Sequence, residues 1–184
     1  VVDIFNTAEF RTTYGLGKIN VLATYNAGRN GTGQTVAVID TGIDLDHLDL
    51  DQNISAASID IVINNYATVN DVNGHGAQVA GIIAAEENDL AMHGVAYGAT
   101  VLAVRADALC FPVYTPACRG FNDTDLADAL DYAVAQGAGV INLSLGGTSP
   151  QSSVFTDALL RAANPRRLRT NSPRYGRIRI PPEK

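Results

Sequence analysis

The sequence predicts an α/β fold in which a mostly parallel sheet carries helices on both faces. Two observations support this class. Short apolar runs rich in β-branched residues, such as 36–39, alternate along the chain with segments of helical periodicity. Four consecutive apolar residues are typical of a strand that is buried on both faces, as in a parallel sheet. The 184 residues have the length of one domain, which is long enough to bury a substantial core.

The individual elements follow from these patterns in chain order. Strands are expected at residues 35–40, 59–63, 100–105 and 140–145. Helices are expected at residues 14–25 (ending at Gly28), 75–87, about 123–136 and about 152–163. The third helix is the clearest, because its apolar residues recur at i, i+3, i+4, i+7 and i+8 from Leu126 and form one buried stripe. Asn122 or Asp123 caps this helix, and Gly137 ends it.

Two polar residues stand where a parallel sheet places its ligands. Asp40 ends the strand 35–40, and ligands of open α/β sheets bind at the carboxyl ends of strands. His75 opens a helix between Gly74 and Gly76, which let the backbone approach a substrate closely. Alone, Asp40 would be an ordinary turn residue and His75 a structural histidine. Together they are two thirds of a Ser-His-Asp device, in the order Asp then His.

Three blocks of sequence resemble one family. Residues 38–44 and 75–81 resemble the Asp and His blocks of the subtilisin-like serine proteases, the subtilases, and residues 140–147 resemble the substrate-binding strand. The resemblance spans roughly residues 8–160. It implies a three-layer subtilisin-like fold, incomplete at the carboxyl-terminal side, and a serine endopeptidase mechanism. His75 would then be the general base that activates a serine, and Asp40 would orient its ring.

The resemblance also implies a peptide-binding edge. Ser144, Leu145 and Gly146 correspond to the segment that pairs with the substrate backbone as an added strand. Without the other two blocks, this segment would be a plain strand end followed by a Gly-Gly turn. The expected partner is therefore a peptide or protein substrate.

The family's nucleophile segment, of the Gly-Thr-Ser-Met-Ala type, has no counterpart in this sequence. Ser144 is a poor substitute, since it does not lie in a strained Gly-x-Ser-x-Gly elbow. Ala77 and Gln78 also replace the Thr and His that usually follow His-Gly. We therefore expect this polypeptide to be inactive. The alternatives are a non-catalytic peptide-binding pseudoenzyme and a non-functional fragment of a truncated or frame-shifted gene.

The resemblance extends to a calcium site. Asp49 follows the family's pattern for a calcium-binding carboxylate, and Asn88 lies in a loop that resembles the matching one. Oxygen ligands of this kind suit calcium, but a solvated acidic loop would have the same composition. No cofactor is expected to be required for catalysis. His47 and His93 are expected to be structural or exposed.

The two cysteines indicate a compartment. Cys110 and Cys118 bracket a short loop with two prolines and no nearby His, which argues against a metal site. We expect a disulfide between Cys110 and Cys118, which would imply an oxidising environment, and two unpaired thiols are the alternative. We expect a secreted, cell-surface or periplasmic protein. No apolar run is long enough to span a membrane, and the sequence begins without a signal peptide.

Charge divides the chain at its end. Residues 1–160 contain 18 acidic and 5 basic residues, which argues against nucleic acid as a partner. Residues 164–184 are rich in Pro and Arg and are expected to be an unstructured basic tail, next to a partial peptidase domain at 1–163. A frame shift, a truncated gene, a remnant of cloning and a functional basic arm each remain open as its origin.

Overall fold

A computed structural model describes residue 5 and residues 7–109, 119–147 and 151–164. Its main sheet has four strands in the order β2-β3-β1-β6, all parallel. The strands are β1 (Thr35–Asp40), β2 (Ile59–Asp60), β3 (Thr100–Arg105) and β6 (Val140–Asn142). β1 pairs with β3 along its whole length, from Thr35 opposite Thr100 to Asp40 opposite Arg105. Asp40 therefore lies at the carboxyl edge of the sheet, next to its centre.

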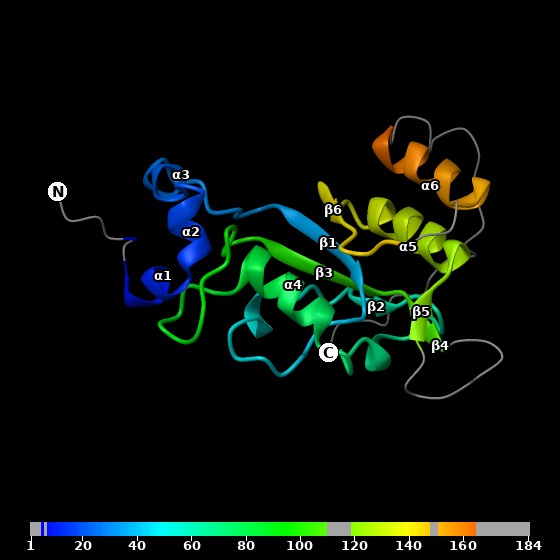
Figure 1. The fold of residues 1–184 in the computed structure, drawn as a ribbon, viewed down its shortest axis with the longest axis horizontal. Helices are drawn as coiled ribbons and strands as arrows, with labels where there is room; N and C mark the ends of the chain where they lie inside the picture. The colour runs from blue at the N-terminus through cyan, green and yellow to red at the C-terminus, as the bar shows by residue number, and fades with distance from the viewer. Residues whose placement is uncertain (1–4, 6, 110–118, 148–150, 165–184) are drawn as a thin grey trace.

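Helices cover both faces of this sheet (Figure 1). Val36 and Val38 of β1 face one way and join a buried cluster with α4 (His75–Ala84). Ala37 and Ile39 face the other way and join a second cluster with α5 (Asp123–Ala135). α6 (Ser153–Ala163) packs against α5 on the side away from the strands (Figure 1). The result is a three-layer α/β arrangement, as the sequence predicts.

The amino-terminal region differs from the predicted single helix at 14–25. It forms three short helices, α1 (Ala8–Thr12), α2 (Tyr14–Lys18) and α3 (Leu22–Asn26). The prediction of one helix is wrong because Asn20 adopts a left-handed conformation, with φ of 55°, between α2 and α3. Gly15 and Gly17 also give this segment a low helix propensity. The short helices pack through their own apolar cluster, which includes Tyr25.

Other predicted elements agree with the structure, with shorter ends. The strands 35–40 and 100–105 are confirmed residue for residue. The strand 59–63 is cut to two residues, since Asp60 turns back to pair with Asn65. The helix at 75–87 ends at Ala84, where Ala85 becomes extended, and the strand 140–145 ends at Asn142. Asn122 is the cap of α5, because its side chain accepts a hydrogen bond from the Asp125 amide at 2.9 Å.

A small antiparallel pair was not predicted. β4 (Asp107–Leu109) pairs with β5 (Arg119–Phe121) directly after β3. Two 3-10 turns, Asp51–Asn53 and Tyr66–Thr68, complete the described elements. Figure 1 shows the pair close to the amino-terminal end of α5.

Some predictions fall on residues that the structure does not describe. Cys110 and Cys118 lie outside the described residues, so their bridge stays a prediction. α6 ends at Ala163, and residues 165–184 of the predicted tail also lie outside. Among the described residues, no helix has the length and apolar character needed to cross a membrane.

Candidate active site

The side chains of Asp40 and His75 form a hydrogen-bonded pair. The distance from His75 Nδ1 to Asp40 Oδ1 is 2.8 Å. An ionised carboxylate can only accept, so Nδ1 carries the proton and Nε2 is left as the basic nitrogen. Asp40 is 1% exposed, whereas the His75 side chain is 49% exposed. The hydrogen bond to Asp40 and the charge of that residue raise the pKa of His75. This is the arrangement of an oriented general base.

Close backbone contact makes this pair possible. A Cβ atom on Gly76 would lie 2.3 Å from the carbonyl oxygen of Gly42 and 3.2 Å from Cβ of Asp40. A Cβ on Gly42, whose φ is 119°, would lie 2.2 Å from the carbonyl oxygen of Val69. Only glycine fits at both positions, so the first turn of α4 can rest directly on the loop that follows β1.

A second carboxylate fixes the turn that precedes His75. Asp71 accepts hydrogen bonds from the amides of Asn73, Gly74 and Ala77 at 2.8–2.9 Å. Burial raises the pKa of Asp71, but these three bonds and one from Thr41 outweigh burial and lower it overall. Sequence analysis missed this residue, although an Asp-Val-Asn-Gly turn directly before the histidine is a recognisable signal.

Thr41 links the two loops. Its hydroxyl oxygen accepts the Gly76 amide at 2.9 Å, and its own amide donates to Asp40 Oδ1 at 2.7 Å. Asp40 Oδ1 therefore accepts hydrogen bonds from both the Thr41 amide and His75 Nδ1. Its other oxygen, Oδ2, is buried and has no partner among the described residues. These contacts fix the Asp40 carboxylate by its backbone neighbour as well as by the imidazole ring.

His75 shares a cavity of about 320 Å³ with the predicted peptide-binding segment. The cavity is lined by residues from five segments: Thr41, Asn73, His75, Asp107, Arg119, Phe121, Ser144, Leu145 and Gly146. Asp40 lies behind His75 and does not line it. The structure thus brings His75 and residues 144–146 together, as expected. Sequence analysis did not place β4 and β5 there, because the hairpin that carries Asp107 and Arg119 was not predicted.

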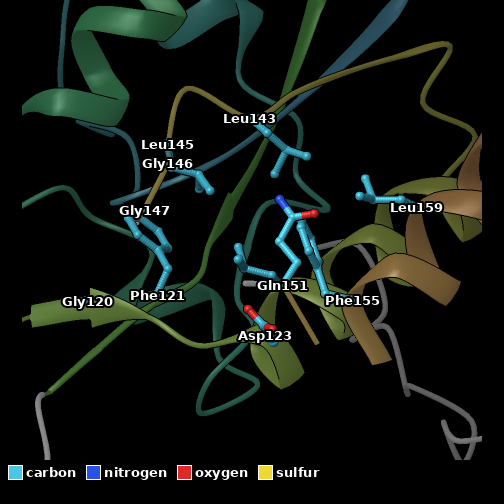
Figure 2. A pocket seen from close by; sticks show the side chains of 11 residues that line it. Gly120, Phe121, Asp123, Leu143, Leu145, Gly146, Gly147, Gln151, Phe155 and Leu159 are labelled. Carbon is cyan, nitrogen blue, oxygen red and sulfur yellow. The ribbon is translucent and has the colours of Figure 1, made fainter. Parts of the chain in front are cut away.

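A second, larger cavity adjoins the first. It measures about 590 Å³ and shares Phe121, Leu145 and Gly146 with the cavity at His75. Figure 2 shows the ring of Phe121 and the side chain of Leu143 at its border, with Phe155 and Leu159 of α6 on the other side. The segment that continues β6 therefore runs along both hollows.

A nucleophile is the part of a protease site that we do not find within the described ranges. No described serine hydroxyl is hydrogen-bonded to His75. Ser144 is the only described serine that lines the cavity, and its hydroxyl accepts from the side-chain amide of Asn142 at 2.8 Å. Its Oγ is thus engaged with the last residue of β6 and not with the imidazole.

Asp49, which was predicted to bind calcium, lies close to the buried carboxylate of Glu9. Asp49 is 1% exposed, and its Oδ2 accepts the Met92 amide at 3.0 Å. Glu9 is 4% exposed, and its Oε2 accepts the Asp89 amide at 3.2 Å. Asp49 Oδ1 and Glu9 Oε1 are both buried without a described partner. Burial raises the pKa of Glu9, and the neighbouring charge of Asp49 raises it further. The two oxygens without partners thus belong to neighbouring buried carboxylates.

Asn88 belongs to the same loop but points its amide elsewhere. Its Nδ2 donates to the Leu48 carbonyl at 3.0 Å, and its Oδ1 accepts the Leu90 amide at 3.1 Å. No set of three or more His, Cys, Asp or Glu in the part of the chain that the structure describes is arranged to hold a metal ion. Glu9 was missed by sequence analysis, because no local pattern links it to a loop 80 residues away.

Comparison with known proteins gives one consistent result. The model of the subtilase family matches residues 31–170. A thermophilic serine proteinase of Bacillus sp. (strain AK1) is 41% identical over 138 residues, which is 72% of this chain and 31% of that protein. Subtilisin Savinase of Lederbergia lenta is 34% identical over 141 residues, which is 77% of this chain and 48% of that protein. The chain thus spans between about a third and a half of these relatives.

Solved structures agree. Fervidolysin from Fervidobacterium pennivorans, a keratinolytic enzyme related to subtilisin, superimposes with a TM-score of 0.69 and 28% identity over 82% of this chain and 22% of that one. A cold-adapted subtilisin-like serine proteinase superimposes with a TM-score of 0.57 and 32% identity, over 75% of this chain and 45% of that one.

Proposed function

The chain belongs to the subtilase family, and from this premise we propose that it is the part of a serine endopeptidase that carries the general base and a peptide-binding edge. One observation carries the proposal: the Asp40–His75 pair, at 2.8 Å, opens into the same cavity as residues 144–146. A histidine oriented by a buried carboxylate, next to an extended segment, is what acyl transfer to a peptide requires.

The roles of the residues follow from their surroundings. A peptide aligned along residues 144–146 would gain main-chain hydrogen bonds as an added strand, and its side chains would enter the two cavities. The free Nε2 of His75 would take a proton from an attacking hydroxyl and return it to the leaving amine. Asp40 would hold the ring in the correct tautomer and stabilise the imidazolium that forms.

For the polypeptide as written, we propose peptide binding without turnover. His75 can accept a proton, but no described hydroxyl is placed to attack a carbonyl carbon. Binding needs only the edge and the cavities, and described residues line both cavities. A non-functional fragment is the competing hypothesis, and it predicts no binding at all.

Peptide affinity tests the proposal. An extended peptide of alanines around one phenylalanine is titrated into the full chain by calorimetry, beside the same peptide with N-methylated backbone amides. We expect N-methylation to abolish binding, because it removes the strand's hydrogen-bond donors. Gly146→Pro should weaken binding, since Pro has no N–H, whereas the control variant Asp157→Asn, on the exposed surface of α6, should leave it unchanged. Equal affinity for both peptides would contradict the strand-like mode.

We also propose a structural calcium ion between Glu9, Asp49 and the 86–92 loop. The support is the pair of buried oxygens, Glu9 Oε1 and Asp49 Oδ1, that lack partners. Calcium prefers carboxylate and carbonyl oxygens and would supply a ligand partner for both oxygens. No catalytic role is assigned to it.

Finally, we propose that the protein functions outside the cytoplasm. The support is the spacing of Cys110 and Cys118, which suits a disulfide in an oxidising compartment. Thiol titration of unreduced, unfolded protein tests this point. We expect no free thiol in protein made under oxidising conditions, and two free thiols would contradict the bridge.

A further inference from the structure

An ion cluster forms one wall of the cavity at His75. Asp107 of β4 and Arg119 of β5 line the cavity. Arg119 donates from Nε to Asp107 Oδ2, and from Nη2 to the main-chain oxygen of Asp107 at 2.6 Å. The two side chains are not equally accessible, because the Arg119 side chain is 24% exposed and that of Asp107 only 2%. A ligand that enters the cavity therefore meets the cation first.

A second arginine, Arg105, also forms an ion pair with Asp107. Arg105 Nε donates to Asp107 Oδ1 at 2.8 Å, and its Nη1 donates to the carbonyl oxygens of Thr68 and Asn70 at 2.8 and 3.0 Å. Asp60 Oδ2 lies 3.9 Å from the same Nε, and Arg105 is 7% exposed. Both carboxylate oxygens of Asp107, and its main-chain oxygen, are therefore taken by arginine donors.

Arg119 keeps hydrogen-bonding capacity that Asp107 has lost. A guanidinium has five N–H donors. Within the described part of the chain, the partners of Arg119 use one on Nε and one on Nη2, which leaves Nη1 and the second Nη2 hydrogen. The other carboxylates near the cavity also have hydrogen-bond partners. Asp40 accepts a hydrogen bond from His75, and Asp71 accepts hydrogen bonds from three backbone amides.

We infer that Arg119 makes this cavity a binding site for a carboxylate, namely a Glu or Asp side chain of a bound peptide close to the bond that lies over His75. The inference rests on the proposed peptide binding and adds its charge selectivity. A carboxylate matches the remaining guanidinium donors and gains a charge-assisted hydrogen bond. A Lys or Arg side chain would have to displace an arginine from Asp107 or approach Arg119 unpaired, which disfavours it.

Matched peptides test the inference. Fluorescein-labelled peptides of alanines and one phenylalanine carry Glu, Gln or Lys at each internal position in turn, and binding to the full chain is followed by fluorescence polarisation at low salt. At one position, Glu should bind about fivefold more tightly than Gln, as expected for a partly exposed charged pair. Arg119→Gln should remove this preference, and Arg119→Lys should retain part of it.

Arg161→Gln is the control. Arg161 forms a similar pair with Asp131, at 2.7 Å, between α6 and α5, so its loss should leave the Glu preference intact. Tighter binding of Lys than of Gln at that position, or a Glu preference that survives Arg119→Gln, would overturn the inference. If the peptides bind but Glu, Gln and Lys give the same affinity at every position, the charge selectivity is overturned and the proposed peptide binding stands. If none of the peptides binds, the proposed peptide binding fails with it. Should Arg119→Gln fail to fold, the wild-type series and Arg119→Lys decide the question.

Discussion

The His75 ring depends on a carboxylate that it touches and on another that holds the preceding turn. Asp40 binds Nδ1 directly, and Asp71 fastens the amides of Asn73, Gly74 and Ala77 around the ring's backbone. Both negative charges favour the imidazolium, with Asp40 contributing the larger effect. One buried and one partly buried carboxylate thus orient the general base before a substrate arrives.

Removing the Asp71 charge tests this arrangement. In Asp71→Asn, we expect the pKa of His75 to fall, but by less than in Asp40→Asn, because Asp71 acts on the ring only through its charge and the turn. The measurement is an NMR titration of the His75 ring in the full chain. Asp157→Asn removes an equal charge from the exposed surface of α6 and should leave the pKa of His75 unchanged. A pKa in Asp71→Asn equal to that in Asp157→Asn would contradict the role of Asp71.

His93 is a buried titratable group, and neither of its ring nitrogens has a hydrogen-bond partner among the described residues. Its ring is 0% exposed and packs against Tyr97 and Tyr25, with ring centroids 4.5 and 5.4 Å away. Burial lowers its pKa from 6.5, and the charges of Glu87 and Asp49 only partly oppose this. The unfolded chain therefore binds the proton more readily than the folded one. The contribution of His93 to stability is lost as pH falls from about 6.5 towards the lower pKa of the folded state.

We therefore expect His93→Leu to be more stable than the wild type at pH 5 and to differ less from it at pH 7.5. Urea unfolding at the two pH values measures the difference. Leu16→Ala is the control, because Leu16 lies buried in the neighbouring apolar cluster and has no titratable side chain, so its loss should leave the pH dependence as in the wild type. A wild-type difference between the two pH values that persists in His93→Leu would contradict the assignment to His93.

At the scale of elements, continuous apolar runs were the most reliable signal. The strands at 35–40 and 100–105 are central and buried on both faces, so their pattern has few alternatives. The pattern fails where tertiary contacts decide. β4 and β5 are strands of only three residues each, and residues 14–25 break at Asn20 to pack around Tyr25. Neither feature has a period that could be read from the sequence.

The close contact between α4 and the loop after β1 can be tested by substitution at Gly76. Gly76→Ala would place its Cβ 2.3 Å from a backbone oxygen, which cannot yield as a flexible side chain could. We expect a loss of about 2–4 kcal/mol in the free energy of unfolding. Gly81→Ala, in the same helix, meets only the Met92 sulfur at 3.3 Å and should cost little, because alanine favours helix. Urea unfolding compares the two, and equal values would contradict the close packing.

At the scale of the molecule, sequence blocks predicted the family and the pairing of Asp40 with His75, and the peptide-binding role of residues 144–146 stays a prediction. Residues that act from a distance were not predicted. Glu9 reaches the 86–92 loop from α1, and Arg119 reaches the cavity through an unforeseen hairpin. Such positions carry no local motif, since their role comes only from the way the elements are packed.

Calcium should stabilise the whole chain through Glu9 and Asp49. We expect the melting temperature to rise with excess calcium and to fall with chelator. At a hundredfold excess over Kd, calcium should add about 2–3 kcal/mol to the free energy of unfolding. The effect should be larger at pH 7 than at pH 4.5, because burial raises the pKa of Glu9 and the uncompensated carboxylate destabilises the fold once ionised. Glu9→Gln should weaken the calcium response, and Asp157→Asn should not. No response to calcium would eliminate the site.

The central claim is that this polypeptide holds an oriented base and that none of its described hydroxyl groups is placed to act as the nucleophile. Loss of the serine costs subtilisin about 10⁶-fold in kcat, so no hydrolysis at a subtilase-like rate is expected here. The direct measurement is labelling of the purified chain with a fluorophosphonate probe for activated serines, beside hydrolysis of a chromogenic peptide. We expect no stoichiometric label and no turnover above background. Stoichiometric labelling that is lost in His75→Ala would contradict it, by showing that a serine of this chain is activated by His75.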